Sequence, residues 1–397
     1  MVSFDVERAR RETSGSREIT HFNNAGAALM PDPVLSAMVA HLQREAAMGG
    51  YEAAEEAAQQ VDHVYDAVAQ LLNCSADEVA IVENATRAWD MAFYAMRFEP
   101  GDRILSSAAE YESNYLAFLQ VCGKTGARVE VVPSDSSGQI AVDTLESMLD
   151  DRVKLISLTH VPTNGGLVNP AAAVGAVARR HGIPFLLDAC QSVGQLPLDV
   201  EEIGCDILSA TGRKYLRGPR GTGLLYVRQS LIDKLEPPFL DLRAAEWMSR
   251  DEYIIRGDAR RFETWETNYG AKIALGVAVD YALEWGIEAV WRRVAILGDS
   301  LRSRLRDIPS ITVRDLGEVQ CGIVSFTCDG LEAIDVQRHL RSVGVNVSVS
   351  PQRYTRLDMD QRGLSEVIRA SVHYYNTEDE IDVVSNHLTR IGGHYLA

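Results

Sequence analysis

The amino-acid sequence predicts an α/β protein with a large, mainly parallel sheet of seven strands and a smaller α+β domain after it. The first observation is that short apolar runs alternate with helix-length segments between about residues 75 and 230. This alternation is typical of parallel strands joined by helices. The second observation is that several runs are apolar throughout, as strands are when helices cover both faces of their sheet. The third is a change near residue 311 to isolated strands and helices.

Seven segments of the first region have the length and the apolar character of strands: Val79–Glu83, Arg103–Ser106, Arg128–Val132, Lys154–Thr159, Pro184–Asp188, Asp206–Ala210 and Gly223–Val227. The helices expected between them are Ala85–Arg97, Ser113–Lys124, Ala141–Leu149 and Ala171–His181. Ligands of parallel sheets usually bind at the carboxyl ends of the strands. The residues directly after these strands are therefore the first candidates for a site.

Helices and a second group of strands flank this region. We expect helices before and after it at Pro33–Ala47, Ala53–Leu72, Gly270–Trp285 and Ile287–Leu305. The C-terminal part is predicted to contain strands Gly322–Thr327, Asn346–Ser350 and Val367–His373, with helices Ala333–Val343 and Thr377–Ile391. The predicted division is an N-terminal segment over residues 1–21, a large domain over 22–270 and a small domain over 271–397.

Composition excludes several classes of function. A net charge of −17 disfavours nucleic acid and anionic membranes as partners. No apolar stretch reaches about 18 residues, and the N-terminus lacks the apolar region of a signal peptide. The six cysteines form no CxxC pair and the nine histidines no HExxH motif, so neither a disulfide framework nor a metal site is expected. We expect a cytoplasmic protein that acts on a small molecule.

Residues that can take part in binding or catalysis follow three of the predicted strands. Asp188 ends one strand, Lys214 follows the next strand in a glycine-rich turn, and Thr86 lies where Val79–Glu83 leads into a helix. Pyridoxal 5′-phosphate needs an amine for its aldehyde, a carboxylate near its pyridine nitrogen, and donors for its phosphate, which a helix N-terminus can supply. Singly, the aspartate reads as a helix cap and the lysine as a solvated loop residue. Their joint order after consecutive strands favours a cofactor site.

These segments resemble the class V aminotransferase family of fold-type I pyridoxal-phosphate enzymes, from Phe22 to about Ile391. That family includes cysteine desulfurases, cystine C–S lyases and isopenicillin N epimerase-like proteins. The most specific matches are Asp188–Ser192 and the turn from Thr211 to Lys214 with its glycine-rich continuation. The resemblance implies pyridoxal 5′-phosphate as cofactor and a homodimer with shared active sites.

The resemblance also implies a role for each matched residue. Lys214 would form the Schiff base and move protons, Asp188 would face the pyridine nitrogen, and Gln191 the ring hydroxyl. The phosphate would be bound by Ala85, Thr86, Arg87 and Thr211, and Asn164 would lie over the cofactor. Arg369 would take the substrate α-carboxylate through two parallel hydrogen bonds. The segment Asn24, Ala25 and Gly26 would line the substrate site.

The sequence departs from the family pattern at three positions. Tyr111 stands after Glu110 where the family stacks a histidine on the cofactor, and tyrosine does not shuttle protons near neutral pH. Arg213 replaces the histidine before the lysine and could give the phosphate a fixed charge. Glu266 occupies the place of a threonine donated by the neighbouring subunit, which leaves Thr264 and Thr267 as alternatives.

The reaction predicted from these features is C–S bond cleavage by β-elimination from a cysteine-derived amino acid. Cysteine desulfurases need a mobile cysteine, and the matching stretch Val347–Tyr354 contains none. The segment Gly49–Ala54 and the turn around Lys214 are similar to ergothioneine-pathway C–S lyases. Residues suspected of reading the substrate side chain are Tyr51, Arg353 and Arg356. An epimerase helped by Tyr111, an aminotransferase, and a non-catalytic ligand-binding protein remain alternatives.

Overall fold

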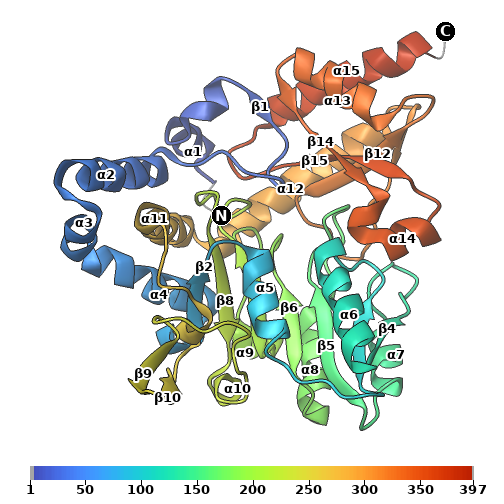
Figure 1. Cartoon of the computed structure of the whole chain (residues 1–397). Helices are drawn as coiled ribbons and strands as arrows, with labels where there is room; N and C mark the ends of the chain where they lie inside the picture. The colour runs from blue at the N-terminus through green and yellow to red at the C-terminus, as the bar shows by residue number, and fades with distance from the viewer. Residues whose placement is uncertain (1–3, 396–397) are drawn as a thin grey trace.

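The seven predicted strands form one sheet in the computed structural model, which describes residues 4–395 (Figure 1). The strand order is β2–β8–β7–β6–β5–β3–β4. Only β8 runs antiparallel to its neighbours β2 and β7, so the mainly parallel sheet is confirmed. The strands are β2 (Val79–Val82), β3 (Arg103–Ser107), β4 (Arg128–Val132), β5 (Val153–Thr159), β6 (Phe185–Asp188), β7 (Ile207–Thr211) and β8 (Gly223–Val227).

Helices cover both faces of this sheet, which explains why several of its strands are apolar throughout. Phe185 and Leu187 of β6 pack into one core, while Leu186 between them packs into a second core on the opposite face. The first face is covered by α4 (Ala58–Leu72), α7 (Val142–Ser147), α8 (Ala171–His181), α9 (Val200–Ile203) and α11 (Tyr269–Trp285). The second is covered by α5 (Ala85–Phe93), α6 (Glu112–Thr125) and α10 (Gln229–Ile232).

A four-stranded antiparallel sheet forms the C-terminal part of the fold, in the order β11–β12–β15–β14. It packs with α12 (Ile287–Arg306), α13 (Ala333–Ser342) and α15 (Glu378–Tyr395) in a separate apolar core. Its strands are β11 (Ile311–Val313), β12 (Ile323–Cys328), β14 (Ser348–Pro351) and β15 (Glu366–Ser371), and α14 (Arg356–Gln361) lies beside them. The predicted change of pattern near residue 311 therefore marks a real change of architecture.

The N-terminal segment packs on this smaller part. Helix α1 (Val6–Arg11) contributes Ala9 to the C-terminal core, and Phe22 is buried there too. Strand β1 (Thr20–His21) pairs with β13 (Val345–Asn346), and the next residues bridge to Ser371 of β15. The chain then passes into α2 (Asp32–Met48) and α3 (Gly50–Glu56). Residues 22–26 are thus held between the two parts of the fold.

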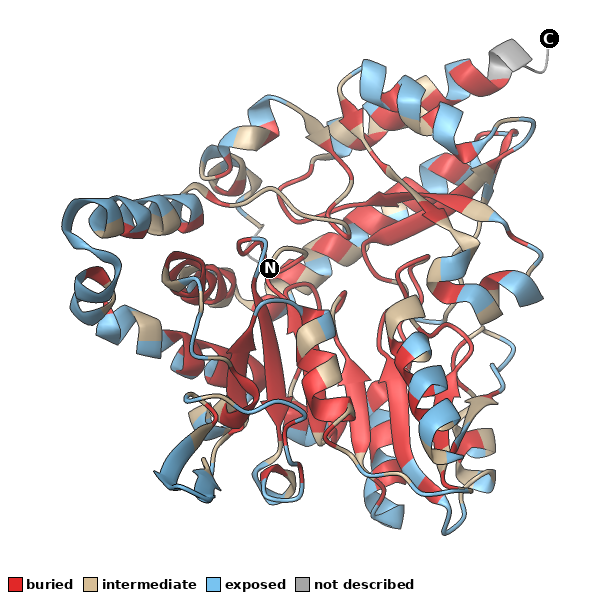
Figure 2. Cartoon of the chain, in the orientation of Figure 1, coloured by how far each residue is buried: buried red, intermediate tan, exposed pale blue. Residues whose placement is uncertain are grey.

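Several local features differ from the prediction, and short elements such as α1, β11 and α14 were not predicted. The expected helix Ala53–Leu72 is two helices, α3 and α4, separated at Ala57, where neighbouring alanines and glutamates give no sign of a break. The expected strand Asn346–Ser350 is divided because β13 and β14 pair with different partners. A hairpin of β9 (Ala245–Ser249) and β10 (Glu252–Ile255) was not predicted, and Figure 2 shows it largely exposed. None of the described helices is both long and apolar enough to cross a membrane.

Candidate active site

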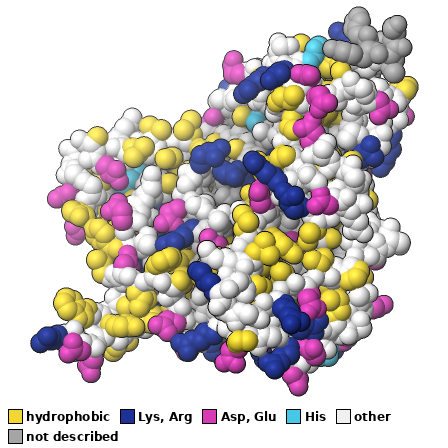
Figure 3. All heavy atoms as spheres, turned by 45° about the vertical axis from the view of Figure 1, so that its right-hand side comes forward, with side chains coloured by type: hydrophobic (Ala, Val, Ile, Leu, Met, Phe, Trp, Pro, Cys, Tyr) yellow, Lys and Arg dark blue, Asp and Glu magenta, His cyan; other side chains and the backbone are white. Residues whose placement is uncertain are grey.

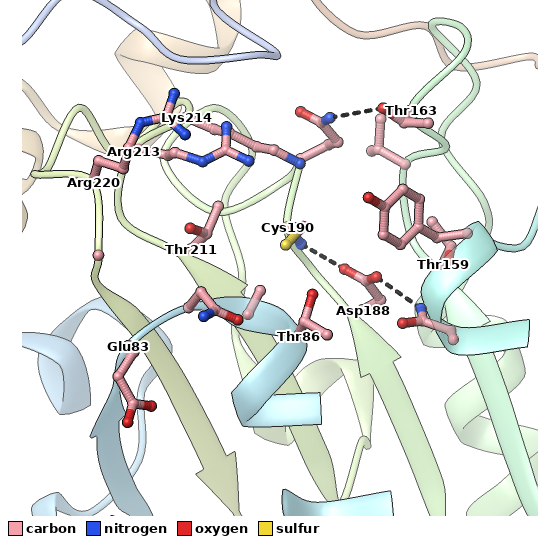
Figure 4. Close-up of a pocket in the computed structure, with 17 residues that line it drawn as sticks. Glu83, Thr86, Thr159, Thr163, Asp188, Cys190, Thr211, Arg213, Lys214 and Arg220 are labelled. Carbon is pink, nitrogen blue, oxygen red and sulfur yellow. Dashed lines mark hydrogen bonds between the residues drawn. The ribbon is translucent and has the colours of Figure 1, made fainter. Parts of the chain in front are cut away.

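A cavity of about 480 Å³ lies at the carboxyl ends of β5, β6 and β7 (Figure 4). The last residues of these strands, Thr159, Asp188 and Thr211, all line it. On the face shown in Figure 3, Lys and Arg side chains gather beside a hollow near the centre. Eight residues that the sequence predicted as site residues line the cavity: Ala85, Thr86, Tyr111, Asp188, Gln191, Thr211, Arg213 and Lys214.

Lys214 lies in a tight turn that follows β7. The Arg217 amide donates to the Lys214 carbonyl (2.9 Å), and the Gly218 amide donates to the Gly212 carbonyl (2.7 Å). A side chain at Gly212 would collide with Thr222 and Leu275, so this close packing requires glycine. Burial lowers the pKa of the Lys214 amine. A larger share of the amine is therefore neutral near neutral pH, which is the form that attacks a carbonyl.

Hydrogen bonds from Arg217 connect the turn that contains Lys214 to other parts of the molecule. Its backbone has a φ of 62°, a left-handed conformation that is unusual for a residue with a side chain. Its buried guanidinium donates to the Leu29 carbonyl (2.8 Å), the Tyr374 hydroxyl (2.6 Å) and the Thr13 hydroxyl (2.6 Å). The turn that carries the amine is thus fixed to both the N-terminal segment and the C-terminal part.

The Asp188 carboxylate is oriented by two hydrogen bonds. Its Oδ1 accepts from the Cys190 amide (2.9 Å) and its Oδ2 from the side-chain amide of Asn114 (2.9 Å). Asp188 is 6% exposed, and Figure 4 shows its carboxylate across the cavity from Lys214. An acceptor held in this way can bind a protonated ring nitrogen.

The N-terminus of α5 forms another wall of the cavity. Asn84 caps this helix by accepting from the Arg87 amide (2.9 Å), and Ala85 and Thr86 lie at the cavity. Gly223 of β8 allows close approach, because a side chain there would collide with the Asn84 backbone. Free N–H groups at such a helix end, with the Thr86 hydroxyl, suit an anionic group. The Thr211 hydroxyl lines the same wall and donates to the Thr222 carbonyl (3.2 Å).

Two arginines lie at the same end of the cavity as Thr211 (Figure 4). Arg213 donates to the Gly26 carbonyl, and Arg220 follows Pro219 in the glycine-rich loop. In the part of the chain that the structure describes, neither guanidinium has a carboxylate partner. Burial and then the charge of Arg220 lower the pKa of Arg213. Two unneutralised positive charges at one place favour a bound anion.

Arg369 reaches the cavity wall from β15. One of its terminal nitrogens donates to the Thr163 carbonyl (2.9 Å) and to the Thr163 hydroxyl (2.8 Å), and Thr163 lines the cavity. Burial lowers the pKa of Arg369 to about 10, and its Nε is buried without a partner. The guanidinium therefore stays charged at neutral pH and keeps donor capacity for a carboxylate.

The segment Asn24–Gly26 contacts the cavity residues through its backbone. Gln191 donates to the Ala25 carbonyl (3.2 Å), and the Gly26 carbonyl accepts from Arg213. The side chain of Asn24 instead binds the Ser371 carbonyl (2.7 Å) and the Tyr375 hydroxyl. Asn24 thus anchors the segment, while Ala25 and Gly26 are its points of contact with the site.

Besides Arg369 and the segment Asn24–Gly26, five residues named from the sequence do not line the cavity: Arg356 and the four described next. Tyr51 is 72% exposed and borders a different cavity with Trp265 and Thr267. Arg353 is exposed, 3.8 Å from the Glu112 carboxylate, because it follows β14 at the surface. The Arg87 guanidinium stacks on Phe239 (4.9 Å), and Asn164 accepts from the Ser350 hydroxyl (2.6 Å). The Arg87 side chain therefore points away from the site, and its backbone amide binds the Asn84 side chain. Asn164 follows the cavity residue Thr163 in the chain but does not itself line the cavity.

Nine of the residues around the cavity were not identified as site residues from the sequence, among them Asn114, Cys190 and Arg220. Cys190 lies inside the segment Asp188–Ser192, so its place there gave a signal. Arg220 lies in the glycine-rich loop, which was read as a turn. Asn114 stands four residues after Glu110, in the first turn of α6, and only the fold brings it to Asp188.

The residues present fit pyridoxal 5′-phosphate. Gln191 Oε1 is buried in the cavity wall without a partner, at a place suited to the polar substituent of an aromatic ring. The cavity also offers an amine at Lys214 whose pKa is lowered by burial, a fixed carboxylate at Asp188 and a helix N-terminus for a phosphate. Together, the fold and the cavity define an enzyme site for this cofactor.

Comparison with known proteins agrees with this geometry. A family model described as aminotransferase class V matches residues 20–384, so the chain belongs to that family, whose enzymes use pyridoxal 5′-phosphate. A probable cysteine desulfurase from Methanothermobacter thermautotrophicus is 28% identical over 400 residues, which are 99% of this chain and 100% of the relative.

Solved structures share the fold. The apo structure of a cysteine desulfurase from Thermococcus onnurineus NA1 has a TM-score of 0.90 at 24% identity and covers 98% of each chain. A cystine C–S lyase solved with its product cysteine persulfide has a TM-score of 0.86 at 24% identity, covering 95% of this chain and 99% of that one. The predicted fold-type I architecture is confirmed.

Proposed function

We propose that this pyridoxal-phosphate enzyme cleaves the Cβ–S bond of a cysteine-derived amino acid by β-elimination, without passing sulfur to a protein cysteine. The observation that carries the proposal is that β14 and the following residues up to Tyr354 contain no cysteine. Cys190 is the one thiol among the cavity residues, and it is fixed in the turn directly after β6. Similarity to a probable cysteine desulfurase supports a cysteine-like substrate.

The cofactor would be held by the residues that surround the cavity. Lys214 would supply the amine, Asp188 would bind the ring nitrogen, and Gln191 would bind the ring substituent. The α5 N-terminus with Thr86, Thr211 and Arg213 takes the phosphate. Tyr111, half-buried at the start of α6, is the aromatic side chain in the cavity that can lie against the ring.

The chain's own residues then divide the work of the reaction. When bound, pyridoxal 5′-phosphate provides an electron-withdrawing ring joined to the substrate nitrogen. Arg369 holds the α-carboxylate, and Lys214 removes the α-proton. The electron pair of the Cα–H bond forms the Cα–Cβ double bond as the Cβ–S bond breaks, and sulfur leaves with the electron pair of the Cβ–S bond and takes up a proton. Water then hydrolyses the released enamine to pyruvate and ammonia. Burial raises the pKa of Tyr111, so its hydroxyl stays protonated near neutral pH and does not serve as the base.

The reaction panel that tests this proposal contains cysteine, cystine, alkyl cysteine conjugates and hercynylcysteine sulfoxide. We expect pyruvate and ammonia in equal amounts from at least one of them. No pyruvate from any, with Cα deuterium exchange and recovered substrate, would indicate an epimerase. Transfer of the amino group to an added keto acid would indicate an aminotransferase. Tyr51 and the surrounding surface segment do not line the cavity, so they give no reason to prefer one conjugate.

A persulfide test separates direct release from transfer to a cysteine. After turnover in the absence of reductant, alkylation and mass spectrometry should find all six cysteines, including Cys190, as ordinary thiols. The reason is that burial raises the pKa of the Cys190 thiol to about 12, which keeps it protonated. A cysteine desulfurase treated in parallel provides the positive control. Persulfide on Cys190 in proportion to turnover would contradict direct release.

Arg220 provides a prediction about the phosphate end of the cavity. The variant Arg220→Gln should weaken binding of pyridoxal 5′-phosphate to the apoenzyme by about 10-fold, because it removes one of two unneutralised charges near the α5 N-terminus. Binding of pyridoxal, which lacks the phosphate, should change less than about 3-fold. Equal effects on the two ligands would show that Arg220 does not contact the phosphate. Arg250→Gln, on the exposed hairpin, is the matched control.

We also propose that the protein is a homodimer. Leu35, Val39 and Leu42 leave one face of α2 apolar and exposed, and Tyr51 and Trp265 continue this surface. Light scattering of the purified protein should give twice the mass of one chain, 43.7 kDa. A monomer at micromolar concentration would contradict the proposal.

A further inference from the structure

A second carboxylate lies directly behind Asp188. Glu110 is 3% exposed, and its side chain accepts hydrogen bonds from four groups: the Ser106 hydroxyl (2.8 Å), the Thr159 hydroxyl, the Tyr111 amide (2.7 Å) and the Asn114 side-chain amide (2.9 Å). Within the residues that the structure describes, no Lys, Arg or His side chain forms an ion pair with Glu110. Burial raises the pKa of Glu110, the hydrogen bond from Thr159 opposes this shift, and the charge of Asp188 reinforces it.

Asn114 joins the two carboxylates. Its Nδ2 donates one hydrogen to Glu110 Oε1 and the other to Asp188 Oδ2, each at 2.9 Å. An amide nitrogen has two hydrogens, so both are used and the amide cannot rotate without losing one of them. Asp188 therefore keeps one orientation, with its Oδ1 bound to the Cys190 amide.

This arrangement places two carboxylates on the same side of the cavity with neutral donors around them. All four groups that bind Glu110 donate to it, which fits an ionised carboxylate, and two buried negative charges are costly unless a positive charge lies close by. The protonated ring nitrogen of the cofactor would be that charge. A second carboxylate behind the first makes loss of this proton less favourable, because it adds to the negative potential at the ring nitrogen.

We propose that Glu110 is a positioning residue that acts through Asn114 to hold the Asp188 carboxylate in place and to keep the cofactor ring nitrogen protonated. The inference rests on the role proposed for Asp188. Neither Glu110 nor Asn114 touches the substrate in this account. Their effect on catalysis passes through the charge and orientation of Asp188 alone.

The test follows the ring nitrogen itself. Apoenzyme is loaded with pyridoxal 5′-phosphate labelled with ¹⁵N in the ring, and the ¹⁵N chemical shift reports protonation. In the wild type we expect the protonated value. In Asn114→Ala the shift should move toward the unprotonated value, and Cα deuterium exchange of bound amino acid should slow about 10- to 100-fold, with KM changed less than about 3-fold.

Ser106→Ala is the matched control, because it removes a different hydrogen bond to Glu110 and leaves the link to Asp188 intact. Its ¹⁵N chemical shift should stay at the protonated value, and its exchange rate should stay within about 3-fold of the wild type. If Asn114→Ala does not fold, Asn114→Ser gives the same test, since one hydroxyl hydrogen cannot serve both carboxylates.

The variant Asp188→Asn separates the role proposed for Asp188 from the role proposed for Glu110. If it leaves the ring nitrogen protonated, the role of Asp188 itself is wrong. If Asp188→Asn removes the proton but Asn114→Ala and Asn114→Ser leave shift and exchange rate unchanged, the role of Glu110 is overturned while that of Asp188 stands.

Discussion

Replacing Lys214 with alanine is expected to lower turnover by at least about 10³-fold, because one side chain both binds the cofactor aldehyde and moves the α-proton. Lys214 is the one lysine among the residues that line the cavity. The measurement is the rate of pyruvate release by enzyme saturated with cofactor, so that weaker cofactor binding does not account for the loss.

The control for this variant is Lys234→Ala, at an exposed position away from the cavity, which should keep wild-type turnover. Added small primary amines should restore part of the activity of Lys214→Ala by serving as the base. Turnover of Lys214→Ala within 10-fold of the wild type, without added amine, would contradict the role of Lys214 as the Schiff-base lysine.

Replacing Asp188 with asparagine is expected to lower kcat by about 10²- to 10³-fold, because it removes the negative charge that stabilises a protonated ring nitrogen. The change is nearly isosteric, so the fold should be retained. The loss should appear in kcat more than in KM, since Asp188 does not contact the substrate carboxylate bound by Arg369. Steady-state kinetics with the best substrate of the panel measure both values.

Asp188→Glu serves as its control, because it keeps the charge at a shifted position and should retain more activity than Asp188→Asn. Equal activity of Asp188→Asn and the wild type would show that the ring does not depend on this carboxylate.

The strands were predictable because burial on both faces leaves long apolar runs in the sequence. Arg128–Val132 and Gly223–Val227 were predicted with their observed bounds, and the ends of the other five strands differ by one residue. The exposed hairpin of β9 and β10 was missed although its strands contain apolar residues such as Trp247, Tyr253 and Ile254, which are exposed and pack on none of the apolar cores described. The end of α3 at Ala57 was missed because alanine and glutamate favour helix on both sides.

The cavity was predictable where a residue directly follows a strand, as Asp188 and Lys214 do. It was not predictable where a residue reaches the cavity from a helix or loop. Asn114 meets Asp188 from α6, although 74 positions separate them in the sequence. Tyr51 was expected near the substrate, but α3 holds it at the surface. Its distance from the cavity depends on how α2 and α3 pack, which a short sequence match does not determine.

The central claim is that one amine, on Lys214, holds the cofactor. The chain has five lysines, Lys124, Lys154, Lys214, Lys234 and Lys272. Among the other lysines, Lys272 is the strongest alternative as the Schiff-base lysine. Its amine is buried and donates to the Tyr65 hydroxyl (2.5 Å), and burial lowers its pKa to about 8. Borohydride reduction of the holoenzyme, digestion and mass spectrometry locate the labelled lysine. The account predicts the label on Lys214 alone; a label on Lys272, or none on any lysine of a yellow preparation, would contradict it.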